Sequence, residues 1–227
     1  MKHFLLFGFL FSCFCTSLSS QIVIRQGFGW GGNELSAIDV ENVRPDDIAL
    51  STGLFNLNLS IKTKIKEVFA LGLETGFAAM SRGRIDMEYT KDGTSYQLLG
   101  QYDSNFAYFL LEPEYYLFKK RNVYLTAGAG FSVGNNFEFV SGRLNRGTNV
   151  NTPSTNLAGL DLETVIGNMF SFGIGTQAKI NQSAHTQTLI DVQIKYINQT
   201  SLNTYSVFPQ FKNQAVLVRL GLQFQID

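Results

Sequence analysis

The chain has 227 residues, a formal net charge of +0 and only 16% charged residues, with 21 Gly, 20 Phe and 9 Tyr. A length of this order favours a single domain, and the lack of net charge argues against a nucleic-acid binder that works through bulk charge. The mean hydropathy of +0.02 is too low for a bundle of membrane-spanning helices. The remaining question is why a chain poor in charge and rich in glycine and aromatic residues is not apolar on average.

Residues 1–20 have the three-part layout of a secretory signal peptide. Lys2 precedes an apolar run, which is followed by small polar residues up to position 20. We therefore expect a signal peptide over 1–20 and a mature domain over 21–227. Two alternatives are a membrane anchor, although the run is shorter than the about 17–25 residues of a spanning helix, and a lipoprotein signal that uses Cys13.

Both cysteines, Cys13 and Cys15, lie inside this segment, so the mature chain would contain none. An exported domain without cysteine has no disulfides and no cysteine-based metal site or nucleophile. We expect neither a cofactor nor a bound metal.

Apolar residues alternate with small or polar residues in eight segments of the mature chain. In the segment 123–134, Val, Leu, Ala and Phe occupy one face, and Tyr, Thr, Gly and Ser the other. This alternation predicts β-strands with one apolar face, and its length suits the about 9–11 residues of a membrane-spanning strand. The eight predicted strands cover 22–30, 55–61, 69–77, 106–118, 123–134, 170–180, 190–196 and 215–226.

The connections between these strands alternate between long and short. Short turns are expected at 62–66, 119–122 and 181–186, and all other connections are long. This alternation predicts an all-β, eight-stranded, antiparallel up-and-down transmembrane β-barrel with long loops at one end and short turns at the other. A soluble barrel of the lipocalin type is the alternative, but the second face carries Gly, Ser, Thr and Asn, which suit a narrow filled interior better than a wetted surface.

With this signal, these strands and the closing strand 216–224, the chain resembles small outer-membrane β-barrel proteins of the OmpX and OmpA type, and more closely the PorT-like barrels of Bacteroidetes. The resemblance rests on architecture across 21–227 and not on a short motif. Such barrels usually end on an aromatic residue, whereas Phe224 lies three residues before the end of this chain. The resemblance implies an outer-membrane protein that is surrounded by lipid and inserted by the barrel-assembly machinery, and an accessory role in secretion is one role that it suggests. It implies no particular activity.

Charged residues occur on the faces expected to line the lumen. The acidic ones lie mainly on the third and fourth predicted strands, and the basic ones on the first, seventh and eighth, so they would face one another across a closed barrel. Because isolated buried charges are costly, we expect them to pair. The predicted network, which would plug the lumen, comprises Arg25, Glu74, Glu112, Glu114, Asp191, Lys195 and Arg219. A narrow pore for small solutes is the alternative.

The alternation continues past the third predicted strand into a hairpin over 81–105. Asp92-Gly93 inside it favours a tight turn. We expect an exposed two-stranded ribbon that could dock a protein partner through its backbone edge. An ordinary extended loop is the alternative.

Aromatic residues lie near both expected membrane interfaces, as in the girdles of outer-membrane barrels. The predicted interface aromatics are Phe28, Trp30, Phe69, Tyr108, Phe118, Tyr196 and Phe224.

The sequence offers little support for an enzyme. The single histidine of the mature chain, His185, lies in a predicted short turn with Ser183 two residues before it, and neighbours of this kind rarely provide the geometry of a catalytic pair. The acidic first loop matches no EF-hand spacing. We expect a non-enzymatic outer-membrane protein with a structural, surface-interaction or secretion-accessory role, and a lipid-acting barrel enzyme is the weakest alternative.

Overall fold

The computed structural model describes residues 21–43, 49–66, 68–118, 122–147, 154–160, 162, 164–183, 185–201 and 207–226. The signal peptide predicted over 1–20 lies outside the described residues. The strands are β1 (Ile22–Ala37), β2 (Ala49–Lys66), β3 (Phe69–Lys91), β4 (Thr94–Tyr116), β5 (Val123–Arg146), β6 (Ser154–Asn156), β7 (Thr164–Gln182), β8 (Thr186–Ser201) and β9 (Phe211–Ile226).

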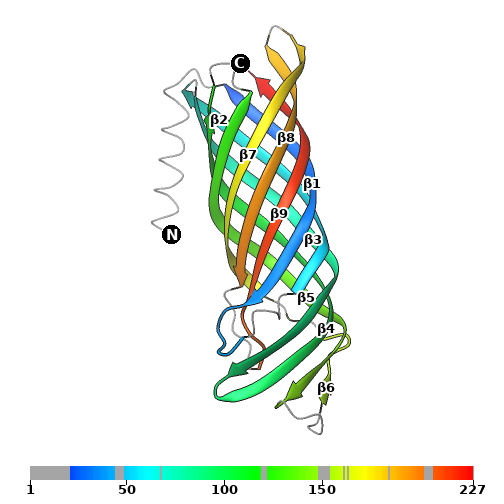
Figure 1. The fold of residues 1–227 in the computed structure, drawn as a ribbon. Coiled ribbons are helices and arrows are strands. Elements are labelled where there is room, and N and C mark those ends of the chain that lie inside the picture. The colour runs from blue at the N-terminus through cyan, green and yellow to red at the C-terminus, as the bar shows by residue number, and fades with distance from the viewer. Residues whose placement is uncertain are drawn as a thin grey trace.

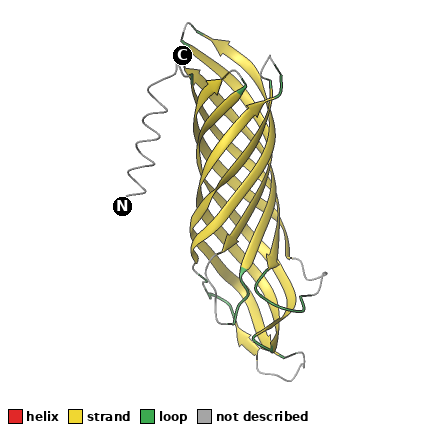
Figure 2. Cartoon of the chain, turned by 90° about the vertical axis from the view of Figure 1, so that its left-hand side faces the viewer, coloured by secondary structure: helices red, strands yellow, loops and turns green. Residues whose placement is uncertain are grey.

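Eight of these strands form a closed ring in which every neighbouring pair is antiparallel. The order is β4-β3-β2-β1-β9-β8-β7-β5, and pairing of β4 with β5 closes the ring. The short strand β6 pairs only with the far end of β5. The predicted eight-stranded antiparallel fold is therefore confirmed (Figures 1 and 2).

The two ends of the ring differ as predicted. The turns β2–β3, β4–β5 and β7–β8 lie at the end where β9 finishes, and the long connections and β6 lie at the opposite end (Figure 1). Within the described part of the chain, no helix is long and apolar enough to cross a membrane.

The strands are longer than the alternation predicted. They reach 24 residues in β5 and 23 residues in β3 and β4. The turn predicted at 62–66 is wrong, because β2 continues to Lys66 and places Lys62 and Lys64 inside the ring. Both lysines continue the inward parity of Ser60.

The outer face of the ring is apolar over a continuous belt. On β9 the outward residues from Val216 to Ile226 are all large and aliphatic or aromatic, and all are at least 37% exposed. At about 3.3 Å per residue this run measures about 33 Å along the strand, which becomes about 25 Å along the barrel axis for a tilt of about 40°. The fold is thus apolar outside and, near the short turns, charged inside.

Candidate functional site in the lumen

The half of the lumen nearer the short turns contains a network of buried charges. At the end of the network that is farther from the short turns, Glu74 of β3 accepts hydrogen bonds from Lys195 Nζ of β8 at 2.8 Å and from Arg219 Nη1 of β9 at 2.9 Å. Lys195 Nζ also forms an ion pair with Glu112 of β4. Because β3 lies opposite β8 in the ring, and β4 opposite β9, these pairs cross the lumen.

The network continues toward the short turns. Lys62 Nζ of β2 donates to Glu112 at 2.6 Å and to Glu114 at 2.8 Å. Arg25 of β1 pairs with Glu114 at 3.0 Å and with Asp191 of β8 at 3.2 Å. Glu112 therefore joins the two ends into one continuous network.

Charge is balanced inside this network. It contains four carboxylates and four cations, and each of the eight residues is at most 3% exposed. An unpaired ion in such a place would cost several kcal/mol, so the balance allows all eight to remain charged. The structure brings together every residue that the sequence placed in the network, and adds Lys62.

Tyr108 does not lie at a membrane interface, and that prediction is wrong. It is fully buried in the lumen, where its hydroxyl donates to Glu74 at 3.1 Å and accepts from Arg219 Nη2 at 2.9 Å. Asn56 also donates to it, at 3.1 Å. On β4 the even-numbered residues from 106 to 116 face inward, so Tyr108 shares the parity of Glu112 and Glu114.

Glycines on neighbouring strands make room for these large side chains. Gly76 lies opposite Tyr108, and a methyl group at Gly76 would overlap the tyrosine ring. Gly29 lies opposite Arg219, whose Cγ would be 2.8 Å from an added Cβ. Glycine in a strand often marks such a close approach. Gly175 opposite Tyr124 repeats the pattern, so the glycine content reflects the packing of a narrow lumen.

The half of the lumen nearer the long loops is mainly apolar, in contrast to the polar interior predicted from the sequence. Tyr102, Phe137 and Phe211 form a stack with centroid separations of 4.4 and 4.9 Å. They belong to a buried core that extends beyond the outer belt into the long-loop end. The predicted ion-paired lumen is therefore present between Tyr108 and the short turns.

Long connections fold onto this apolar half. Asp39 of the β1–β2 connection pairs with Lys91 at the tip of β3 at 3.0 Å, and accepts the backbone N–H of Gln210. Tyr89 donates its hydroxyl to the carbonyl of Val207 at 2.8 Å. Burial raises the pKa of the Tyr89 phenol above its ordinary value of about 10, so the hydroxyl stays protonated and keeps this bond at neutral pH.

The hairpin predicted over 81–105 exists, with its turn at Asp92-Gly93 in the left-handed backbone region. It is not a two-stranded ribbon, because β5 continues to Arg146 and covers the outer edge of β4. The edge that remains belongs to β3, where no described strand pairs between Gly83 and Tyr89.

The other six predicted interface aromatics are on the outer face or partly exposed. Trp30 and Phe118 are the most exposed of them, at 66% and 61%. The remaining four are Phe28, Phe69, Tyr196 and Phe224.

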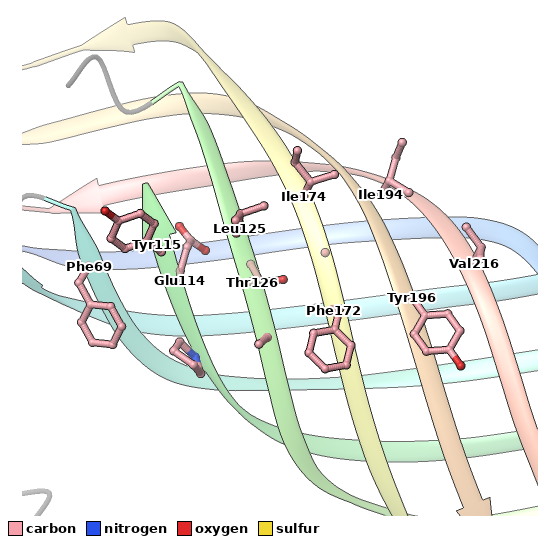
Figure 3. A pocket seen from close by; sticks show the side chains of 13 residues that line it. Phe69, Glu114, Tyr115, Leu125, Thr126, Phe172, Ile174, Ile194, Tyr196 and Val216 are labelled. Carbon is pink, nitrogen blue, oxygen red and sulfur yellow. The ribbon is translucent and has the colours of Figure 1, made fainter. Parts of the chain in front are cut away.

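Pro113 interrupts the wall between β4 and β5. Leu117 donates its N–H to Val123 of β5, so odd-numbered residues of β4 face β5, and Pro113 has no N–H to donate there. Glu112 and Pro113 have no paired residue on β5, whereas Leu111 before them and Glu114 after them do. A shallow apolar groove of about 730 Å³ lies over this seam on the outer wall (Figure 3).

The residues weighed for catalysis do not form a pair. Ser183 Oγ lies 2.6 Å from Thr186 Oγ1, and His185 is exposed in the β7–β8 turn. Among the described residues, no three His, Cys, Asp or Glu side chains are grouped so that they could hold a metal ion.

No family model matches the chain, and no curated protein matches it. Among solved structures, Ail, the attachment invasion locus protein of Yersinia pestis, is similar at 11% identity and a TM-score of 0.41, over 91% of this chain and 99% of Ail. Neisserial surface protein A is similar at 10% identity and a TM-score of 0.40, over 89% of this chain and 95% of that one. The outer membrane protease OmpT from Escherichia coli is similar at 10% identity and a TM-score of 0.36, over 93% and 99%. These similarities assign no activity to the chain, so its function has to be inferred from its own side chains.

Proposed function

We propose that the chain is an exported, integral outer-membrane β-barrel with a closed lumen, which anchors the long-loop end at the cell surface as a platform for a protein partner. The observation that carries this proposal is the inverted polarity of the ring. Its outer face is an apolar belt about 25 Å high, which fits the hydrocarbon layer of an outer membrane, and its inner face holds eight paired charges. A soluble barrel would expose that belt to water.

Two layers of side chains support a closed lumen. The ion-pair network fills the half near the short turns, and the aromatic core fills the half near the long loops. An eight-stranded barrel is narrow enough to be filled by side chains alone. Conduction would require the network and the core to rearrange together, so we place a narrow pore second.

The part of the β3 edge that no described strand covers supports a docking role. The backbone N–H and C=O of Thr90 both form hydrogen bonds with Glu41, on the side of β3 that faces away from β4. The backbone groups of every second residue in a strand point to the same side, so those of Arg84 and Asp86 also point to this edge. An exposed edge can accept an extended segment of a partner by backbone pairing. We propose this edge as the contact for the partner, in either a surface-interaction or a secretion-accessory role.

The substitution Asp86→Pro tests the docking role. It removes an outward N–H without removing a bond to β4, so partner capture from cell extracts should fall while the barrel remains folded. Asp86→Ala keeps the N–H and is the control. Equal capture by both variants would exclude strand pairing at this edge.

We propose no enzymatic role. The hydroxyl of Ser183 hydrogen-bonds with Thr186, and His185 is exposed in the β7–β8 turn, whereas the carboxylates of the network are buried. A lipase, acyltransferase or protease activity that depends on His185 would contradict this proposal.

A further inference from the structure

The shallow groove on the outer wall crosses the apolar belt obliquely (Figure 3). Near the short turns its lining includes Phe69, the first residue of β3, which pairs with Tyr115 of β4. Farther from the short turns, Phe172 of β7 pairs with Tyr196 of β8, and Tyr196 with Val216 of β9. Val216 is the residue of the outer belt on β9 that lies nearest the long loops. The groove therefore runs from the short-turn end of the belt to its long-loop end.

Two compact side chains line the groove near its middle. Pro113 of β4 falls opposite Ala127 of β5 in the register on either side of the seam. On the short-turn side they are flanked by the larger Tyr115 and Leu125, which pair with each other. The five spacings of about 4.8 Å between neighbouring strands from β3 to β9 give the groove a length of about 24 Å. This length is comparable with that of an extended long-chain fatty acyl group.

A tyrosine hydroxyl at the long-loop end of the groove has a proton to donate. Tyr196 Oη accepts hydrogen bonds from Gln214 Nε2 at 2.5 Å and from Asn198 Nδ2 at 3.4 Å. Both bonds use lone pairs of the oxygen, and among the described residues the O–H itself has no acceptor. Because Tyr196 pairs with Val216, its hydroxyl lies at the edge of the belt, at the level of lipid headgroups.

We propose that this groove is a binding site for one ester-linked acyl chain of a membrane lipid. The chain lies along the groove over Pro113 and Ala127, and its ester carbonyl accepts the hydrogen bond that the Tyr196 hydroxyl donates. The fixed hollow and the fixed donor distinguish this lipid from the mobile lipids around the rest of the belt. The inference rests on the membrane insertion in the proposed function, and it goes beyond the platform role, which needs no bound lipid.

Native mass spectrometry of the folded chain, released from lipid nanodiscs, tests the site. The nanodiscs contain equal amounts of diacyl and dialkyl phosphatidylcholine with chains of the same length, which differ only in the ester carbonyls. We expect the natural sequence to retain one lipid after collisional activation has removed the others. A single hydrogen bond contributes about 1 kcal/mol, so the retained lipid should be the diacyl form by about threefold or more.

Variants assign the two parts of the site. Tyr196→Phe keeps the groove and should retain a lipid without preference for the ester. Ala127→Leu places bulk in the groove and should lose most of the retained lipid. Ala129→Leu is the matched control, because Ala129 lies on the same face of β5 but outside the groove, and it should behave as the natural sequence. If Ala127→Leu does not fold, the smaller change Ala127→Val should still lower the retained fraction.

Three results would each overturn the inference. They are an inserted barrel of natural sequence that retains no lipid or retains both lipids equally, equal retention by Ala127→Leu and Ala129→Leu, and an ester preference that survives Tyr196→Phe. A chain that does not insert into nanodiscs as a folded barrel would instead contradict the proposed function, on which the inference rests.

Discussion

Lys62 is the residue on which the balance of the buried network depends most. Its ammonium lies between Glu112 and Glu114 at 2.6 and 2.8 Å, and no part of its side chain is exposed. Lys62→Met would leave the network with one excess negative charge, and breaking a buried pair from one side costs about 3–5 kcal/mol.

We therefore expect Lys62→Met to lower the free energy of unfolding by about that amount, measured by urea titration in lipid vesicles. Adding Glu114→Gln restores neutrality and should recover much of the loss. The exposed Lys179 provides the control, because Lys179→Met should change the free energy by less than about 0.5 kcal/mol. Equal effects at both lysines would show that the network does not stabilise the barrel.

Gly76 tests the packing of the lumen at the same scale. A methyl group there would overlap the ring of Tyr108 and approach the backbone carbonyl of Leu57 at 2.5 Å. Overpacking of this kind typically costs about 1–3 kcal/mol. Gly76→Ala should therefore destabilise the barrel, whereas Gly53→Ala, with open space around the added atom, should not. A neutral Gly76→Ala variant would contradict the packing described for Tyr108.

Among the elements, the long connections depend on Asp39 more than the barrel does. The Asp39 carboxylate forms an ion pair with Lys91 and accepts a hydrogen bond from the backbone N–H of Gln210, and its side chain is 22% exposed. Because a partly exposed pair contributes only about 1 kcal/mol or less, Asp39→Ala should leave the unfolding of the barrel nearly unchanged. The segment 207–210 should nevertheless become more sensitive to limited proteolysis. Unchanged cleavage would mean that this ion pair does not hold the connections in place.

The strength of sequence reasoning also differs among the elements. Period-two alternation located all eight ring strands, since each has one lipid-like face, and most of the network followed from parity. Lys62 and Tyr108 both continue the inward parity of their strands, whereas the predicted second strand ended before Lys62, and Tyr108 was placed at a membrane interface. The apolar half of the lumen was not predicted because the polarity of the two faces reverses beyond the belt. In this part of β3, Ile85 and Met87 face inward and Arg84 and Asp86 face outward, whereas the prediction kept the inner face polar along the whole strand. The interruption at Pro113 was overlooked, although a proline inside a strand is a signal that the sequence provides.

At the scale of the whole molecule, the composition of the chain follows from two opposed faces. Apolar side chains form the outer belt, and glycines leave space for a few long, charged residues inside. Low charge, abundant glycine and a mean hydropathy near zero therefore have one cause. The proposed closure of the lumen belongs to the same scale, because among the described residues an aromatic core follows the ion-pair network along the axis.

The closed lumen is tested most directly by the conductance of the purified, folded chain in a planar lipid bilayer. We predict no stable conductance above the bilayer background for the natural sequence. A triple variant should raise the conductance if it inserts into the bilayer, because it disrupts both the ion-pair network and the aromatic core. Its substitutions are Lys62→Met, Phe137→Ala and Phe211→Ala. A stable, wide conductance from the natural sequence would contradict the closed lumen and favour a pore.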